Sequence, residues 1–143
     1  MIMLKHLIFC FSLYFAITSF SAIADTIQIK TPLIDNCDKK SHQAIVYSIC
    51  LDEAVKQVER ELKAWQLESE DKVKAITQKL QNEAALYEFK KANKYYNQFI
   101  ESHCRSLFFT KQNMAEAANL FRVCKIKQTR IRMQNLKYEI NQK

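Results

Sequence analysis

The sequence has 143 residues, with 22 Lys and Arg against 15 Asp and Glu, and a formal net charge of +7. It contains no glycine and one proline. A P-loop and a G-x-G-x-x-G nucleotide-binding turn are therefore excluded, because both need backbone that a side chain would obstruct. Tight primed hairpin turns, which favour glycine, are not expected either. The composition predicts an all-α protein whose helices are separated by short polar breaks.

The first 24 residues have the pattern of a secretory signal peptide. Basic residues precede an apolar run over residues 7–20, and small residues at positions 22 and 24 fit an A-x-A cleavage site. The run is shorter than the roughly 20 residues of a membrane span, which argues against the alternative of an uncleaved anchor. Bulky Phe9 immediately before Cys10 argues against a lipoprotein signal. We predict that residues 1–24 are removed and that the protein is periplasmic or secreted.

Four cysteines remain in the predicted mature chain, residues 25–143, whose net charge falls from +7 to about +6 when Lys5 is removed. This length suits one domain with a modest core. Export to an oxidising compartment predicts that the cysteines form disulfides. Zinc and c-type haem are the competing interpretations, but the sequence has neither a C-x2-C pair nor C-x-x-C-H. Of three possible pairings we favour the one that joins chain neighbours, Cys37 with Cys50 and Cys104 with Cys124.

The first part of the mature chain predicts a leader and two helices. Residues 25–36 show no periodicity, and we expect an extended leader there. A short helix is expected over residues 42–49, and Asp52 is a suitable N-cap for a second helix. Apolar residues at a three-four spacing mark the buried face of that helix: Val55, Val58, Leu62 and Trp65. The polar run over residues 66–72 shifts this phase, and we favour a continuous or mildly kinked helix over a fresh start.

A central helix follows the break at Asn82 and Glu83. Its apolar side chains again recur every three or four residues: Leu86, Phe89, Tyr96, Ile100 and Leu107. Residues 105–113 predict a turn-rich connection, and a last helix is expected from about residue 114 to about residue 140. The whole pattern predicts a small disulfide-stapled bundle of three to four helices, with residues 37–143 as its single domain.

An arginine shares the apolar face of the last helix, because Thr129, Arg132 and Leu136 follow the same spacing. One interpretation is a solvated guanidinium whose stem lies on the core. The other is an ion pair with a carboxylate of a neighbouring helix, since an unpaired charge at a packed face would be costly. Glu59 and Glu101 are the candidate partners.

The ordered combination of these residues resembles the N-terminal domain of the LprI-type lysozyme inhibitors, formerly the DUF1311 group. The resemblance covers about residues 36–137 and rests on Cys37, Cys50, Glu59, Cys104, Cys124, Thr129, Arg132 and Leu136. The family tends to carry Gln, Trp, Arg and Asp where this chain has Asn93, Tyr96, Ile100 and Glu101. The resemblance implies an exported, disulfide-bonded helical domain, with lysozyme inhibition as the activity of some members. We predict structural roles for the polar residues Glu59, Asn93, Glu101, Thr129 and Arg132.

Catalysis is not predicted. His103 beside Cys104 could make a thiolate nucleophile, but an exported cysteine is expected to be bonded and no third, orienting residue is recognisable. Glu59 and Glu61 are two residues apart on a helix and point to different faces, which does not support acid–base cooperation. We predict a non-enzymatic protein with no cofactor and no metal.

Basic residues form two clusters. The last helix carries Arg122, Lys125, Lys127, Arg130 and Arg132, and the central helix carries Lys90, Lys91 and Lys94 beside Tyr95 and Tyr96. Aromatic residues among basic ones could serve single-stranded nucleic acid, but export argues against that partner. An ordinary solvated basic face and a surface for anionic lipid or polymer of the cell envelope are the remaining interpretations.

Two function classes follow. The first is an exported binding domain that occludes a protein target, such as lysozyme or another peptidoglycan hydrolase. Its contact residues would include Phe108 and Phe109, exposed in the predicted connection over residues 105–113. The second is an envelope interaction protein that uses its basic face on anionic lipid or polymer. The sequence leaves the oligomeric state open.

Overall fold

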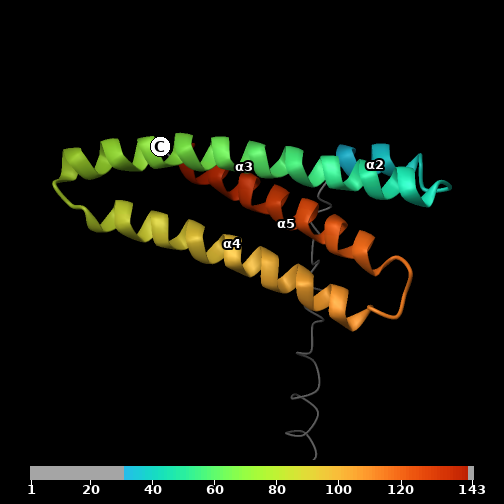
Figure 1. Ribbon diagram of the computed structural model, residues 1–143. Helices are drawn as coiled ribbons and strands as arrows, with labels where there is room; N and C mark the ends of the chain where they lie inside the picture. The colour runs from blue at the N-terminus through green and yellow to red at the C-terminus, as the bar shows by residue number, and fades with distance from the viewer. Residues whose placement is uncertain (1–30, 142–143) are drawn as a thin grey trace, which may run out of the picture.

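The computed structural model describes residues 31–141, which fold into the helices α2 (Pro32–Asp38), α3 (Ala44–Leu80), α4 (Ala84–Thr110) and α5 (Ala117–Ile140) (Figure 1). These residues contain no strand, so the predicted all-α fold class is confirmed. The predicted signal peptide and its cleavage site lie outside the described residues. None of the helices in the described part of the chain combines the length and the apolar character that crossing a membrane requires.

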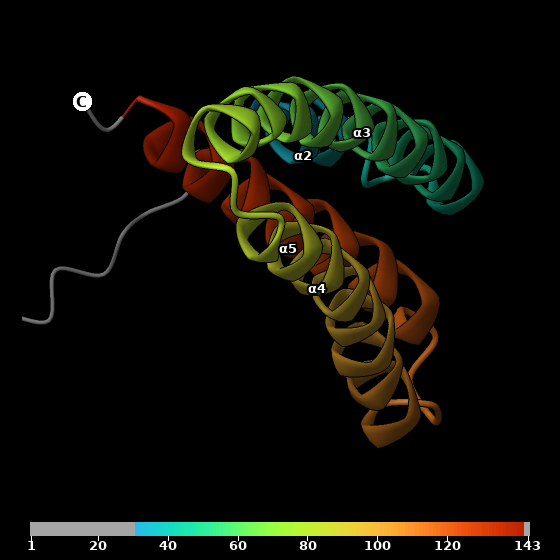
Figure 2. The same cartoon turned by 90° about the vertical axis from the view of Figure 1, so that its left-hand side faces the viewer.

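The three long helices run up, down and up, so that α3 and α5 point the same way and α4 points the opposite way (Figure 1). Helix α5 packs against both of the others, and it lies beside α4 along its length (Figure 2). Helices α3 and α4 are closest at the short connection that joins them. They diverge towards the other end, where residues 111–116 join α4 to α5. At that end α5 therefore lies between the two diverging helices.

The main core lies where α3 and α5 face each other. Its buried side chains follow the three-four spacing of each helix: Leu51, Ala54, Val58 and Leu62 from α3, and Ile126, Met133 and Leu136 from α5. A separate cluster joins α4 to α5 through Ile100, Cys104 and Cys124. Burying one large aliphatic side chain stabilises a fold by about 2 kcal/mol. Since more such side chains are buried in the main core than in the separate cluster, the contact between α3 and α5 supplies most of the apolar stabilisation.

Helix α2 corrects the prediction of an extended leader over residues 25–36. Pro32 occupies its first turn, where the missing N–H leaves no intrahelical bond unmade and the fixed φ suits a helix. Ile34 and Cys37 are three residues apart and are buried in the main core. A segment this short is helical because of that packing, which a periodicity search cannot detect. Residues 25–30 of the predicted leader lie outside the described residues.

Helix α3 is continuous over Ala44–Leu80, so the predicted short helix over residues 42–49 and the fresh start at Asp52 are wrong. Leu51 is fully buried, so the apolar face of the helix continues through the residues where a break before Asp52 was expected. The Asp52 carboxylate accepts hydrogen bonds from Arg122 of α5 instead of capping a helix. Tertiary contacts therefore override the local capping signal.

The continuation of α3 through residues 66–72 agrees with the favoured prediction. Ser69, a possible cap in this run, is buried and donates its hydroxyl to the carbonyl oxygen of Trp65 at 2.7 Å. The helix ends at Leu80, and its C-cap residue Gln81 adopts the left-handed conformation with φ 52°. Asn82 then accepts a hydrogen bond from the first backbone N–H of α4 at 3.0 Å. The predicted break at this point is confirmed.

Helix α4 extends to Thr110, so the predicted turn-rich connection is wrong for residues 105–110. No glycine or proline interrupts this segment, and the helix continues until residues 111–116. Helix α5 accordingly begins at Ala117 rather than near residue 114. Phe108 and Phe109 therefore stand on a rigid helix and not in a loop.

Two disulfides join the helices in the favoured pairing. Cys37–Cys50 links α2 to α3 across 13 residues, and Cys104–Cys124 links α4 to α5 across 20 residues. Each closure of this length stabilises a fold by about 3 kcal/mol, largely by restricting the unfolded chain. Two such bonds fit a protein that matures in an oxidising compartment.

Candidate functional site

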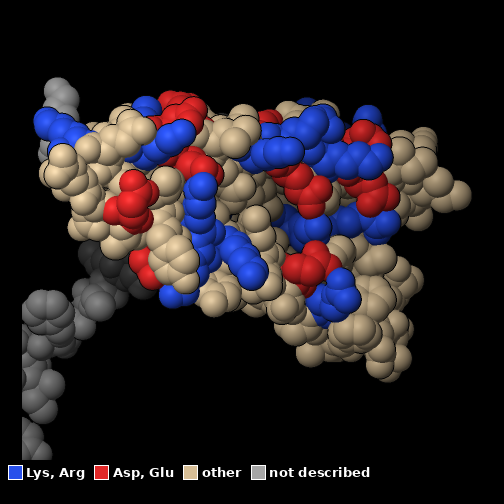
Figure 3. Space-filling model, turned by 60° about the vertical axis from the view of Figure 1, so that its left-hand side comes forward, with Lys and Arg blue, Asp and Glu red and all other residues tan. Residues whose placement is uncertain are grey.

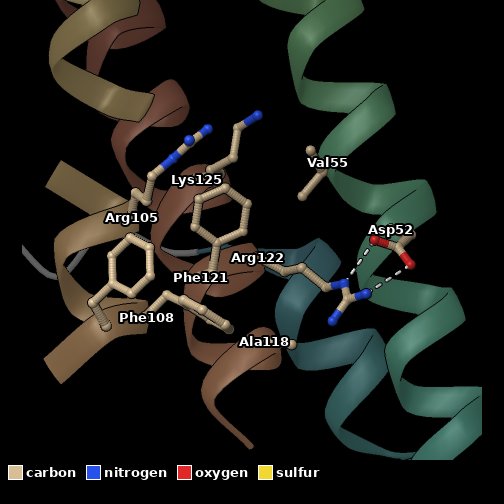
Figure 4. Close-up of a pocket in the computed structure, with 9 residues that line it drawn as sticks. Asp52, Val55, Arg105, Phe108, Ala118, Phe121, Arg122 and Lys125 are labelled. Atoms are coloured by element: carbon tan, nitrogen blue, oxygen red, sulfur yellow. Dashed lines mark hydrogen bonds and ion pairs between the residues drawn. The ribbon is translucent and has the colours of Figure 1, made fainter. Parts of the chain in front are cut away.

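A hollow of about 410 Å³ opens where the start of α3, the end of α4 and the start of α5 meet (Figure 4). Phenyl rings from α4 and α5 form its apolar side, and charged side chains surround them. This aromatic hollow is lined by Asp52, Val55, Arg105, Phe108, Phe109, Ala118, Phe121, Arg122 and Lys125. Its volume lies within the range of ligand-binding pockets.

The disulfide between α4 and α5 fixes the walls of the aromatic hollow. Arg105 and Phe108 follow Cys104 by one and four residues, and Phe121 and Lys125 flank Cys124. Because residues three and four apart share a helix face, Phe108 and Phe121 lie on the same faces of α4 and α5 as the two bonded cysteines. The apolar side of the hollow is thus preorganised by a covalent bond.

The two predicted contact residues, Phe108 and Phe109, both line this hollow. Phe108 is half-buried, whereas Phe109 is 57% exposed, and their rings meet edge to face with centroids 5.4 Å apart. An exposed ring next to a half-buried one offers both a contact surface and a cavity wall. Their role in contacting a partner stays a prediction.

A bidentate ion pair between Asp52 and Arg122 closes the α3 side of the aromatic hollow. Arg122 Nε donates to Oδ1 of Asp52 at 2.6 Å and Nη2 donates to Oδ2 at 3.1 Å (Figure 4). Its Nη1 donates to Oδ1 of Asn119 at 3.1 Å, and the same oxygen accepts the hydroxyl of Ser48 at 2.9 Å. The hydrogen bond from Arg122 lowers the pKa of Asp52, outweighing the opposite effect of burial. Sequence reasoning missed this pair, since residues 70 positions apart carry no local signal.

A second hollow, of about 400 Å³, adjoins the first and shares Lys125 with it. This polar hollow is lined by Glu59, Leu62, Lys63, Gln66, Asn97, Ile100, Glu101, Lys125 and Thr129. Two of the residues with predicted structural roles, Glu59 and Glu101, face each other across Lys125. Its Nζ lies 2.7 Å from Oε1 of Glu59 and 3.4 Å from Oε2 of Glu101. Buried Thr129 lies in the same hollow, as part of the floor that α5 provides.

The pKa values of two charged groups of the polar hollow, Lys125 and Glu101, are shifted by their ion pairs. Burial acts to lower the pKa of Lys125, but its bonds to Glu59 and Glu101 raise it overall above the ordinary value. The hydrogen bond from Arg105 lowers the pKa of Glu101, and the charge of Lys125 adds to the effect. A general acid needs a raised carboxyl pKa, so Glu101 is unsuited to that role at neutral pH.

Arg132 lies in a different network from the one predicted. Its Nη2 donates to Oδ1 of Asn93 at 2.8 Å, and its Nη1 lies 3.1 Å from Oε1 of Glu139. The guanidinium also stands over the ring of Tyr96 at 5.3 Å, a cation–π contact that helps to compensate its burial. The prediction that Arg132 pairs with Glu59 or Glu101 is wrong, because both carboxylates form ion pairs with Lys125. The structural roles of Asn93 and Arg132 stay predictions.

The basic clusters are largely paired with acids inside the described part of the chain. On α5, Arg122, Lys125 and Arg132 contact carboxylates as above, and Arg130 Nη1 lies 3.0 Å from Oε2 of Glu61. On α4, Lys90 pairs with Glu70 at 2.9 Å and Lys91 with Glu88 at 3.3 Å. Acidic and basic side chains accordingly alternate over the face drawn in Figure 3. The predicted basic face is thus broken up by carboxylates.

The groups considered for catalysis are occupied by structural contacts. Cys104 is in a disulfide and has no thiol to ionise. The ring of His103 stacks on that of Phe99 with centroids 5.3 Å apart. Within residues 31–141, no group of His, Cys, Asp and Glu side chains is arranged to hold a metal ion.

Comparison with family models, curated proteins and solved structures finds no match to this chain. The resemblance to the LprI-type inhibitors therefore stays a proposal based on the residue pattern. The chemistry of the two hollows has to be derived from their own geometry.

Proposed function

We propose that this chain is an exported, non-enzymatic binding domain that occludes a protein target such as a peptidoglycan hydrolase. The observation that carries the proposal is the aromatic hollow, a solvent-open cavity with phenyl rings on a covalently braced pair of helices. An apolar pocket with a few fixed polar groups is the usual form of a binding site. The signal-like N-terminus and the two disulfides support a periplasmic or secreted location.

A rigid aromatic surface suits protein recognition in particular. Aromatic side chains dominate the energetics of many protein interfaces, since a few central residues supply most of the affinity. Phe109 stands exposed on α4 beside the hollow, so a partner would bury it without rearranging the backbone. Preorganisation by the Cys104–Cys124 bond reduces the entropy lost on binding.

The alternative, attachment to anionic lipid or polymer through a basic face, has less support. Nearly all the cations of the predicted face on α5 already contact carboxylates, and Lys127 is the exception among the described residues. A polyanion would have to compete with these internal partners for each cation. Such attachment would also weaken steeply with salt, whereas burial of Phe109 in a protein interface would not.

The proposal is tested by capture and inhibition with a matched pair of variants. The oxidised protein is immobilised, incubated with envelope extract and probed for bound peptidoglycan hydrolases, and it is also titrated into a lysozyme turnover assay. Phe109→Ala should weaken capture or inhibition at least about tenfold, the loss typical of an interface hot spot. Tyr95→Ala is the control, because Tyr95 is equally exposed on the same helix (56% against 57%) but does not line the hollow. Failure to retain any hydrolase, together with no inhibition at micromolar excess, would refute the proposal.

A further inference from the structure

A second surface of the molecule, on the side of α4 and α5 that faces away from α3, is apolar and exposed. Phe99 and His103 each lie two residues from Glu101, which lines the polar hollow beside α3, and two residues turn a helix by about 200°. On α5, Ile126 and Met133 pack against α3, and Ile131 lies on the opposite side of the helix. We call this surface the outer face. Four of its large side chains are between 37% and 70% exposed: Phe99, Leu107, Leu120 and Tyr138.

The outer face is continuous across the two helices. Helices α4 and α5 run in opposite directions and are joined at Cys104 and Cys124, so residues before 104 lie level with residues after 124. Phe99 and Ile131 therefore lie towards one end of the face, and Leu107 and Leu120 lie towards the other. The ring of Phe99 also contacts those of Tyr96 and His103, with centroids 5.8 Å and 5.3 Å apart. An apolar surface of this extent marks an interaction site more often than a solvated side.

The outer face is almost free of charge. Lys127 is the one residue with a formal charge among the described residues that follow its helical steps, at positions 92, 96, 99, 103, 106 and 110 and at positions 120, 124, 127, 131, 134 and 138. The polar groups at these positions include the hydroxyls of Ser106 and Thr110 and the amide of Gln134, which both donate and accept hydrogen bonds. Such a surface can pair with a copy of itself.

Its size suits a weak specific contact. Residues 92–110 of α4 and 120–138 of α5 each span about 27 Å at 1.5 Å per residue, and two packed helices are about 20 Å wide. The face therefore has an area of roughly 540 Å², and two copies would bury roughly 1,100 Å² in total. This total just exceeds the roughly 1,000 Å² expected of a biological interface, at the weak end of the range.

We propose that a second copy of this chain covers the outer face, so that α4 and α5 of the two copies form a four-helix bundle about a two-fold axis. In a two-fold contact the same patch meets itself, and a patch with several charges of one sign would be repelled. The chain as a whole carries a net charge of +7, so two copies meet with least repulsion where charges are fewest. An acidic protein or an anionic lipid surface would favour several free cations, and the outer face presents one.

Lys127 gives the dimer a distinctive signature. It lies one helical turn before Ile131 and makes no ion pair with any described residue. A single lysine at a core position of a helical bundle restricts the arrangement of the helices at a cost in stability. Its long stem lets the ammonium reach water at the rim. Replacing Lys127 by a neutral residue should therefore strengthen the dimer, whereas it would weaken the binding of an acidic partner.

The inference does not depend on the proposed function. The aromatic and polar hollows lie on the α3 side of α4 and α5, so both copies keep them open when the outer faces meet. A dimer of this kind would present two binding hollows to a target.

The test is the oligomeric state of the oxidised protein, measured by sedimentation equilibrium from about 1 to about 500 μM. We expect the mass to rise from one copy to two within this range. Phe99→Ser should weaken the dimer at least about tenfold, the loss typical of a central aromatic contact. Lys127→Gln should strengthen it at least about threefold, a gain that misfolding cannot produce. Lys94→Gln is the matched control, since Lys94 is exposed on α4 and makes no ion pair with a described residue but lies off the outer face.

A single-copy mass at about 500 μM, or a dimer that Lys127→Gln weakens, would overturn the inference. Weakening of the dimer between about 20 and about 150 mM salt would do the same, because screening should help two positively charged copies to associate. Phe109→Ala separates this inference from the proposed function. It should reduce target capture and leave the dimer intact, and a dimer lost in Phe109→Ala but not in Phe99→Ser would place the contact at the aromatic hollow instead.

Discussion

Removing the two disulfides separately should cost similar stability but have different effects on the candidate site. The paired variants are Cys104→Ala with Cys124→Ala, and Cys37→Ala with Cys50→Ala. Loop closure over the separations of 20 and 13 residues gives about 3 kcal/mol for each bond, with a difference of only about 0.4 kcal/mol. For a domain of this size that corresponds to a fall in Tm of about 13 °C in either case.

The effects on the aromatic hollow should differ because only one bond supports it. Cys104 and Cys124 hold the residues that line the hollow, whereas Cys37 and Cys50 join α2 to the opposite side of α3. Amide hydrogen exchange should accelerate over residues 105–110 and 117–125 in the first variant and over residues 32–38 in the second. Thermal unfolding followed by circular dichroism gives the matched stability loss.

Equal protection of residues 105–125 in the two variants would refute the reasoning. So would a first variant that loses stability but still binds a partner as tightly as the unmodified protein. Either result would mean that packing of Phe108 and Phe121 alone maintains the hollow.

Two further predictions concern the polar contacts. Arg132→Ala should lower the free energy of unfolding by about 1–3 kcal/mol in urea titrations, because Asn93 loses a buried donor. Lys127→Ala is the control with little expected effect, and equal small losses would show that Arg132 is only a surface cation. The lowered pKa of Asp52 means that its ion pair stabilises the fold at neutral pH and that this contribution disappears as pH falls from the ordinary value of 3.8 through the lowered one. The stability difference between the unmodified protein and Asp52→Asn should therefore be largest near neutral pH and shrink in acid, and a difference that grows in acid would contradict this sign.

The sequence was informative where local rules and chain neighbours decide the structure. The disulfide pairing followed from cysteines that bracket single turns or short connections, and the break at Asn82 followed from its polar surroundings. The break at Asp52 was predicted wrongly, because a good N-cap residue is equally suited to an ion pair with a distant arginine. Which use prevails depends on the packing of α5 against α3, which no local pattern contains.

The partners of Arg132 show the same limit and one missed signal. Glu139 lies seven residues after Arg132, which is two helical turns and therefore the same face of α5. That spacing was available in the sequence. The contact with Asn93 was not, since it depends on the register of α4 against α5. The two hollows were equally beyond reach, because their lining comes from three helices and they share Lys125, whose carboxylate partners lie on two of them.

The placement of the two disulfides divides the molecule into two braced halves. One bond ties α2 to α3 and the other ties α4 to α5, and neither crosses from one half to the other. The backbone connects the two halves through the turn at Gln81. They are otherwise held together by the core between α3 and α5 and by ion pairs such as Asp52–Arg122 and Glu59–Lys125. The distance between the two halves, on which the openings of both hollows depend, is thus set by packing and ion pairs and not by a cross-link. Ionic strength, which weakens these ion pairs, should therefore reduce only the polar part of the contact between the halves and leave the apolar part unchanged.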